Sequence, residues 1–448
     1  EEKTELEFYD VVVAGGGPAG VAAAIAAARN GKKVLLIEKE GYLGGMAASA
    51  LVPAFCPFTD GKNLLAGGIG LEILMELKKE CFVSPFYDRK PDRIEGIDWY
   101  PIDSEALKRV LDRMVLESGC HILLHTMVID CQAQGNELTH ITIFNKGGTK
   151  KIYGSVFIDC SGDGDLTAMA GGPFQYGDEK GRVQAGTLCF KISNFDVDRF
   201  MEYARATGED GNLNQGVKRA KANGDFPDGE NKVAGMSITG PGTASLNFGH
   251  IYEIQPFDEE NMTQAEINGR KNLPVLMEFL RKYVPGAEKA VLAASGPSIG
   301  TRESRRIVGE YCLTAEDYAN RADFEDAIGY YSYPIDMHAA AKEEREGREE
   351  VYQSSKYKMG EAYAIPYRSL LSIKFTNLLT AGRTISCDRA MQASVRVMPA
   401  CFITGQAAGT AAAISTEQGC SVKDIDVKIL RQRLKEQGAC LKKGTPYR

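Results

Sequence analysis

The sequence has few of the residues that build metal centres or redox dithiols. Its 448 residues include five histidines and one tryptophan, and its eleven cysteines contain no C-x-x-C pair. A local zinc knuckle or dithiol motif needs such a pair, so we exclude both and expect no metal. Scattered cysteines in odd number indicate reduced, buried thiols and favour the cytoplasm. Position 1 is Glu rather than Met, which also fits a chain whose N-terminal leader was removed.

Excess positive charge and long apolar runs are also absent. The net charge is −7, so we expect no nucleic-acid partner. The longest apolar stretch of its kind, Val21–Ala28, is far shorter than the roughly 20 residues of a membrane-spanning helix, and we predict no membrane span. Hydrophobic residues at 44% and charged residues at 25% are typical of a folded chain, whose length suggests two domains.

The chain opens with a strand, a glycine turn, a helix and a second strand. Tyr9–Ala14 is an apolar run, and Gly15-x-Gly17-x-x-Gly20 follows it and begins a helix. Gly15 suits a sharp turn, Gly17 a close approach to a pyrophosphate, and Gly20 helix packing against the sheet. Glu38 ends the next strand, Lys33–Ile37, where its carboxylate can accept hydrogen bonds from ribose hydroxyls. The pattern predicts a dinucleotide site, for NAD or FAD.

Two later glycine clusters favour FAD. Gly44-Gly45-Met46 follows the strand that carries the acid, and Asp159–Asp165 (DCSGDGD) follows a second buried strand, Val156–Asp159. Small residues there allow close approach to an extended diphosphate and ribityl chain, although a plain turn is the alternative for the second cluster. Near the end, a strand runs into Gly382, and Pro399 occupies the first turn of an Ala- and Gly-rich helix. The amino end of that helix would stabilise negative charge on a reduced flavin.

These stretches resemble the FAD-dependent oxidoreductases of the glutathione-reductase-like superfamily. The resemblance is closer to a bacterial FAD-dependent oxidoreductase family related to the flavin subunit of heterodisulfide reductase. The stretches that carry it are YDVVVAGGGPAG, LIEKEGYLGGMAAS, FIDCSGDGDLTAMAG, GTRESRRIVGEYCLTAEDY and LLTAGRTISCDRAMQASVRVMPACFITGQAAGTAAA.

The resemblance implies FAD but no particular substrate. This sequence departs from the wider superfamily at Arg383, where many relatives have a ribityl-binding Asp. The FAD-binding residues that it implies are Gly15, Gly17, Pro18, Ala19, Gly20, Glu38, Lys39, Gly44, Gly45, Met46, Val128, Ser161, Gly162, Asp163, Gly382, Arg383, Arg396, Val397 and Met398.

We predict an α/β fold in which a three-layer, Rossmann-like FAD-binding domain carries an inserted, mixed α+β substrate domain. The FAD domain is expected at residues 1–56, 105–172 and 362–448, and the substrate or cap domain at 57–104 and 173–361. Ser104 is expected to cap the helix that follows it. The segment around Arg302–Arg306 is expected to be a strand before a helix capped by Thr314.

Four residues are candidates for the catalytic site. Arg302 and Arg305 could bind an anion bidentately, although ion pairs of this arginine cluster with Glu303 and Glu310 are the alternative. His338 could act as a general acid or base, and Cys56 could approach the flavin, with structural roles as alternatives.

The sequence contains one dinucleotide fingerprint and no C-x-x-x-x-C pair. A separate NAD(P)H domain and disulfide-reductase chemistry are therefore not expected. We expect an enzyme that transfers hydride between a small organic substrate and flavin N5. The alternatives are an electron-transfer subunit with a protein partner and a flavin monooxygenase.

Overall fold

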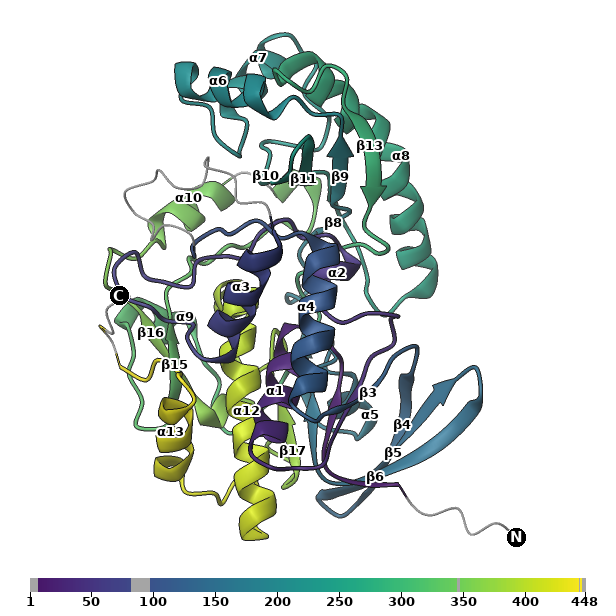
Figure 1. Ribbon diagram of the computed structural model, residues 1–448, viewed down its shortest axis with the longest axis vertical. Coiled ribbons are helices and arrows are strands. Elements are labelled where there is room, and N and C mark those ends of the chain that lie inside the picture. The colour runs from purple at the N-terminus through teal and green to yellow at the C-terminus, as the bar shows by residue number, and fades with distance from the viewer. Residues whose placement is uncertain (1–6, 82–96, 345–346, 443, 445–448) are drawn as a thin grey trace.

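The computed structural model describes residues 7–81, 97–344, 347–442 and 444. Its main sheet has the strand order β3-β2-β1-β6-β5-β4, and β17 also pairs with β6 (Figure 1). The parallel strands are β1 (Phe8–Ala14), β2 (Val34–Ile37), β3 (His121–Leu123), β17 (Leu378–Thr380) and the second half of β6 (Gly148–Asp159). The first half of β6 forms an antiparallel meander with β4 (Met127–Gln134) and β5 (Glu137–Asn145). The predicted Rossmann-like α/β fold is confirmed.

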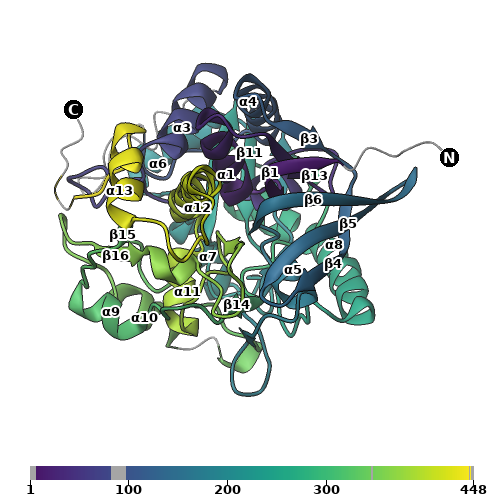
Figure 2. The same ribbon diagram turned by 90° about the horizontal axis from the view of Figure 1, so that it is seen from below.

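Both faces of β1 are buried, which explains its continuous apolar sequence. Val11 and Val13 pack into the core under a helical layer, whereas Val12 and Ala14 pack into the core shared with the meander. The helical layer consists of α1 (Pro18–Arg29), α3 (Ile69–Glu80), α4 (Ser104–Glu117) and α12 (Met398–Gln418). Figure 2 looks almost along α12, which lies at the centre of the molecule. These layers hold the carboxyl ends of β1, β2 and β6 at one edge.

Helices α1 and α12 touch backbone to backbone. A Cβ atom added to Gly405 would lie 2.1 Å from the carbonyl oxygen of Ala19, and one added to Gly409 would lie 2.1 Å from that of Ala23. The small residues of α12 therefore bring it close to other backbone, as the sequence predicts.

A second, antiparallel sheet lies at the top of Figure 1 with the strand order β10-β11-β9-β13. Its strands are β9 (Phe190–Ser193), β10 (Gly235–Gly240), β11 (Thr243–Asn247) and β13 (Val291–Ser295). With α6 (Val197–Thr207), α7 (Asn214–Ala222) and α8 (Glu259–Tyr283) it encloses a separate apolar core. The helices of this region and its sheet thus form a body of their own above the main sheet.

The remaining elements connect and border these two bodies. They are α2 (Met46–Ser49), α5 (Asp165–Met169), β7 (Phe174–Tyr176), β8 (Gly186–Thr187), β12 (His250–Ile251), β14 (Arg305–Ile307), α9 (Ala315–Asn320), β15 (Ala327–Tyr331), η2 (Lys342–Glu344), α10 (Arg348–Ser354), β16 (Tyr363–Pro366), η3 (Tyr367–Leu370), α11 (Arg389–Val395) and α13 (Val427–Glu436). Strands β15 and β16 pack with the helical layer, because Ile328 and Ile365 belong to its core.

Two local predictions need correction. The cap of α4 is Asp103, whose carboxylate accepts from the N–H groups of Glu105 and Ala106, and Ser104 is the first helical residue. Asp and Ser are equally good N-cap residues, and the spacing of the apolar residues in α4 did not distinguish position 103 from position 104. The strand predicted around Arg302 is only the short β14, since its single partner β7 has three residues. Thr314 does cap α9, in a capping box with Asp317.

In the described ranges, no single helix has both the length and the apolar character to cross a membrane. The pair α11 and α12 passes the same test only when taken together, across a 93° bend.

Candidate functional site

The three fingerprint glycines occupy the junction between β1, α1 and β6. Gly15 has a φ of +103°, and an added Cβ would lie 2.3 Å from the carbonyl oxygen of Cys160. A Cβ on Gly20 would lie 1.8 Å from the carbonyl oxygen of Gly15, so only glycine lets α1 begin here. A Cβ on Gly17 would have only Gly45 within 4 Å, at 3.7 Å, which leaves its other side open. The turn at Gly15 and the packing at Gly20 are thus as the sequence predicts, and the approach of a pyrophosphate to Gly17 stays a prediction.

The carboxylate of Glu38 fixes the glycine loop from the end of β2. Its Oε2 accepts from the N–H of Gly16 at 2.7 Å, and its Oε1 accepts from the N–H of Glu40 at 2.9 Å. Burial raises the pKa of Glu38, against the lowering effect of these two backbone hydrogen bonds. A buried carboxylate with lone pairs to spare is suited to ribose hydroxyls.

A second glycine loop lies against the first. The N–H of Gly44 donates to the carbonyl oxygen of Gly16 at 2.9 Å, and a Cβ on Gly45 would lie 2.9 Å from the Cα of Gly17. Both Gly44 (φ +117°) and Gly45 (φ +51°) are in the left-handed region. Lys39 is exposed beside this loop, and Val128 is half-buried on β4.

The Asp159–Asp165 turn is tied to the Gly382 segment by an ion pair. Nη2 of Arg383 lies 2.8 Å from Oδ1 of Asp163, and its Nε donates to the carbonyl oxygen of Gly162. Burial would raise the pKa of Asp163, but Arg383 and Ser304 hold it below its usual value. Ser161 Oγ donates to Asp159 at 2.7 Å. Arg383 therefore positions the acid of the other turn.

The residues present fit FAD. Helices α1 and α12 both begin without a side-chain cap and without an acidic residue in the first turn, so their positive ends remain uncompensated. The uncapped end of α1 lies at the open side of Gly17, and free N–H groups at a helix amino end are suited to a diphosphate. Gly382 (φ +90°) donates its N–H to Thr404 on α12 at 3.0 Å, which joins the turn to that helix.

A cavity of about 890 Å³ begins where α12 begins and extends under the upper sheet. Its lining combines two groups of predicted residues. Met46, Arg383, Arg396, Val397 and Met398 come from the predicted cofactor set, and Cys56, Arg302 and His338 from the predicted catalytic set. Arg305 is not among the lining residues: it pairs with Asp165 at 2.9 Å, and its guanidinium lies 3.6 Å from the ring centre of Phe257.

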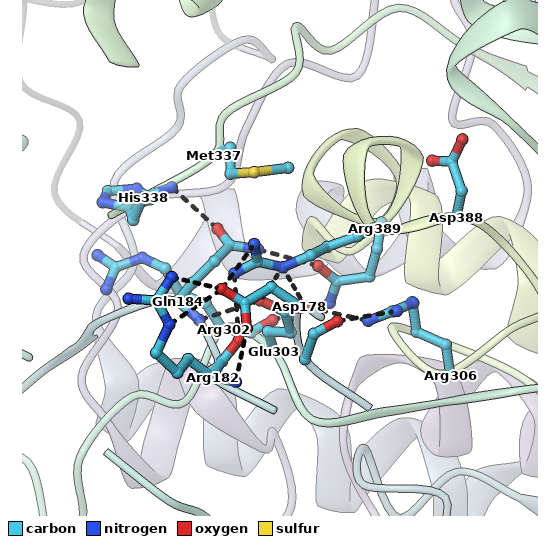
Figure 3. Close-up of polar contacts among 12 residues, drawn as sticks. Asp178, Arg182, Gln184, Arg302, Glu303, Arg306, Met337, His338, Asp388 and Arg389 are labelled. Atoms are coloured by element: carbon cyan, nitrogen blue, oxygen red, sulfur yellow. Dashed lines mark hydrogen bonds and ion pairs between the residues drawn. The ribbon is translucent and has the colours of Figure 1, made fainter. Parts of the chain in front are cut away.

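The arginines of this region have different partners. Arg306 is buried and pairs with Oε1 of Glu303 at 3.0 Å, the alternative that the sequence left open for the arginine cluster. Arg389 binds the same carboxylate, at 2.9 Å. Figure 3 shows this network running from Arg306 on the right to His338 on the left. The link is Gln184, whose N–H donates to Glu303 at 3.0 Å and whose Oε1 accepts from the N–H of His338 at 3.0 Å.

His338 belongs to a chain of four titratable groups. Nδ1 of His250 lies 2.8 Å from Oε2 of Glu230, and Nε2 of His250 lies 2.9 Å from Nδ1 of His338. Nε2 of His338 lies 3.5 Å from Oδ2 of Asp336. Glu230 and His250 come from distant segments whose sequence shows no motif, so sequence reasoning did not identify them.

Cys56 lies in the lining as a protonated thiol. Burial raises its pKa to about 12, with Asp336 as a further cause. A thiol with this pKa is a poor nucleophile at neutral pH. All eleven cysteines are free.

We expect the free energy of unfolding to fall as the pH falls from about 6.5 to 4. Burial, and then the charge of Arg302, lowers the pKa of His338 from 6.5 to about 3. In this window the unfolded chain binds a proton that the folded chain does not, so stability is lost by up to about 1.4 kcal/mol per pH unit. Urea titrations at pH 7 and 4.5 measure the loss. His338→Gln should reduce this dependence, and an equally steep dependence in the variant would contradict the assignment.

Sequence comparison identifies the family. Residues 10–434 match the family described as FAD dependent oxidoreductase. A digeranylgeranylglycerophospholipid reductase of Methanoculleus marisnigri is 31% identical over 26% of this chain and 29% of its own length. An uncharacterized protein in the nifH2 5′ region of Methanosarcina barkeri is 58% identical over 25% of this chain and 47% of its own length. The chain thus spans less than half the length of these curated relatives.

Among solved structures, p-nitrophenol 4-monooxygenase PnpA of Pseudomonas putida DLL-E4 has a TM-score of 0.51 at 12% identity. The likeness covers 97% of this chain and 87% of that chain, and it shows a shared fold. Together with the glycine loops, the family match establishes an enzyme that uses FAD. The chain belongs to the FAD-dependent oxidoreductase family.

Proposed function

We propose that this protein transfers hydride between a small organic molecule and FAD within the cavity at the start of α12. We further propose that it belongs to the glutathione-reductase-like superfamily, with a relation to the heterodisulfide reductase flavin subunit. The observation that carries the proposal is the shared lining. One cavity of about 890 Å³ brings Met46, Val397 and Met398 together with Arg302 and His338. A volume of this size suits a small ligand rather than a protein surface.

The protein's part in the reaction is to hold the substrate and manage its proton. FAD, when bound, supplies hydride transfer at N5. The residues that would hold it are those of the two glycine loops, Glu38 and the start of α12. The cap-free amino end of α12 would stabilise negative charge in the cavity beside it.

The four-group chain can move a proton to and from the cavity. In the contact between Nδ1 of His250 and Oε2 of Glu230 the ring nitrogen is the donor and the carboxylate oxygen the acceptor. Nε2 of His250 and Nδ1 of His338 share one hydrogen bond, so only one of these two nitrogens carries the proton at a time. When that proton moves to Nδ1 of His338, Nε2 of His338 can release one on the side of Asp336, which lines the cavity. In the reverse direction Nε2 of His338 takes up a proton and Nδ1 of His338 passes one to Nε2 of His250. Oxidation of a substrate C–H and O–H needs this direction, in which the pair accepts the O–H proton.

Anaerobic mixing with candidate organic donors tests the proposal. We expect one class of small organic molecule to bleach the visible flavin absorbance at a saturable rate, with free FAD as the control. Failure of every organic donor, while a reduced protein succeeds, would reject it in favour of an electron-transfer subunit.

Replacing Glu230 with Gln should lower kcat about 10-fold and change KM little. Gln keeps the acceptor for the N–H of His250 but removes the negative charge beside its ring. The loss of that charge weakens proton binding by the histidine pair, so the acid limb of the kcat profile should move to lower pH. Glu230 is a positioning residue, and Glu230→Asp should restore part of the rate. A variant with an unchanged pH profile would show that Glu230 is only structural.

A further inference from the structure

Arg302 is a buried cation without an anionic partner in the described part of the chain. Its side chain donates from Nη1 to the carbonyl oxygen of Ala185 at 2.6 Å, and from Nη2 to Thr187 Oγ1 at 3.0 Å and Asn247 Oδ1 at 3.4 Å. All three acceptors are neutral. Only 8% of the residue is exposed, and buried charges in proteins are normally paired.

Three neighbouring arginines each pair with a carboxylate, which sets Arg302 and its neutral acceptors apart. Arg305 pairs with Asp165, Arg306 with Glu303, and Arg383 with Asp163. Of these, only Arg383 reaches the cavity, and its charge is already balanced. Of the four, Arg302 is the arginine that reaches the cavity wall with neutral oxygens rather than a carboxylate as its hydrogen-bond acceptors.

Arg396 is a second guanidinium on the same wall. Its Nη2 donates to the carbonyl oxygen of Asp336 at 3.1 Å and lies 3.7 Å from the carboxylate, while its Nε is buried without a hydrogen-bond partner. Burial, and then the charge of Arg396, lowers the pKa of Arg302 to about 10, so Arg302 remains charged at neutral pH. Asp336 is the carboxylate of the described lining that acts on both of them, whereas Glu230, which also acts on Arg302, lies outside the lining against His250. Within the lining, two guanidinium groups therefore face one carboxylate.

The side chains that line the whole cavity carry more positive than negative charge. Besides Arg383, which pairs with Asp163, five Lys and Arg residues line it against Glu209, Asp210 and Asp336, although the chain as a whole carries a net charge of −7. A cleft of one sign attracts ligands of the other. The diphosphate loop does not account for this charge, because none of residues 15–20 is among the described lining residues.

We propose that Arg302 and Arg396 bind the carboxylate of the substrate, which is therefore an organic monocarboxylic acid. The proposal rests on the proposed function, since it names the substrate class of the same cavity. A guanidinium binds a carboxylate through two parallel N–H···O bonds, and Arg396 has a free Nε for such a bond. With one carboxylate already beside the two guanidinium groups, the lining favours a monoanion over a phosphate dianion.

Calorimetric titration of the FAD-containing, oxidised protein tests this without turnover. Benzoate, neutral benzamide of nearly equal shape, and inorganic phosphate are the probes. We expect saturable binding of benzoate, at least about 10-fold weaker binding of benzamide, and no competition by phosphate at equal concentration. Equal affinity for benzoate and benzamide, or phosphate binding stronger than benzoate binding, would overturn the proposal. Because oxidised protein is used, a failure of the hydride-transfer proposal leaves this result readable.

Two variants locate the binding group. Arg302→Gln should weaken benzoate binding at least about 10-fold, and Arg396→Gln should do the same. Arg305→Gln, which changes an arginine outside the lining, should bind benzoate like the unchanged protein. FAD content and melting temperature show whether each variant is folded, and if Arg302→Gln does not fold, Arg396→Gln decides. Unweakened binding in a folded Arg302→Gln or Arg396→Gln protein would reject the assignment.

Discussion

Replacing Gly405 with alanine should destabilise the protein by about 3 kcal/mol, although the same change in an exposed helix would stabilise it by about 1 kcal/mol. The added Cβ would lie 2.1 Å from the carbonyl oxygen of Ala19 and 2.8 Å from its carbonyl carbon. Both obstacles are backbone atoms, so no side-chain rotation can relieve the clash. Helix α12 must then move away from α1, and the start of α12 moves with it.

Urea unfolding measures the destabilisation, and FAD absorbance after gel filtration measures the effect on the site. Gly235→Ala is the matched control, because no heavy atom lies within 4 Å of an added Cβ there and its φ is outside the left-handed region. We expect the control to stay close to the parent protein in stability. Equal stability of the Gly405→Ala protein would show that α1 and α12 do not touch as closely as described.

Replacing Glu38 with alanine should weaken FAD binding about 100-fold. The change removes the carboxylate that accepts hydrogen bonds from the N–H groups of Gly16 and Glu40. The N–H of Gly16 is buried and would then have lost its acceptor. It also removes the carboxylate that we predict to bind the ribose hydroxyls. Both effects act on the bound state, so the loss should exceed that of a single hydrogen bond.

Fluorescence titration of the apoprotein with FAD measures the affinity. Glu40→Ala is the control, since it removes an equal charge two residues away and leaves both hydrogen bonds to the Glu38 carboxylate in place. We expect the control to bind FAD with nearly unchanged affinity. A similar loss in both variants would mean that general charge, rather than the Glu38 contacts, governs binding.

The sequence was sufficient for the features that depend on local sterics. Gly15 needs a left-handed backbone, and Gly20 must pass under the Gly15 carbonyl, so a strand and a helix of this kind can be joined in few ways. Pro399 similarly marks the first turn of α12, because proline is tolerated only there. The N-cap of α4 was predicted one residue too late, because Asp103 rather than Ser104 accepts from the free N–H groups of the first turn.

The partners of the arginines could not be predicted from the sequence. Arg302 and Arg306 are four residues apart on the same segment, yet one meets neutral oxygens and the other the Glu303 carboxylate. The strand expected there begins only at Arg305, so Arg302 lies outside it and its partners do not follow from the regular geometry of a strand.

The sequence by itself determined the nucleotide-binding half of this protein: the glycine loops, the acid at the end of β2, and FAD as the cofactor. These features are contiguous, and backbone sterics restrict which residues can form them. The tertiary structure alone decided the substrate half. His250 and His338 are 88 positions apart, and their contact depends on how the second sheet packs above the first. Such contacts depend on the packing of whole elements, whose faces carry no short motif.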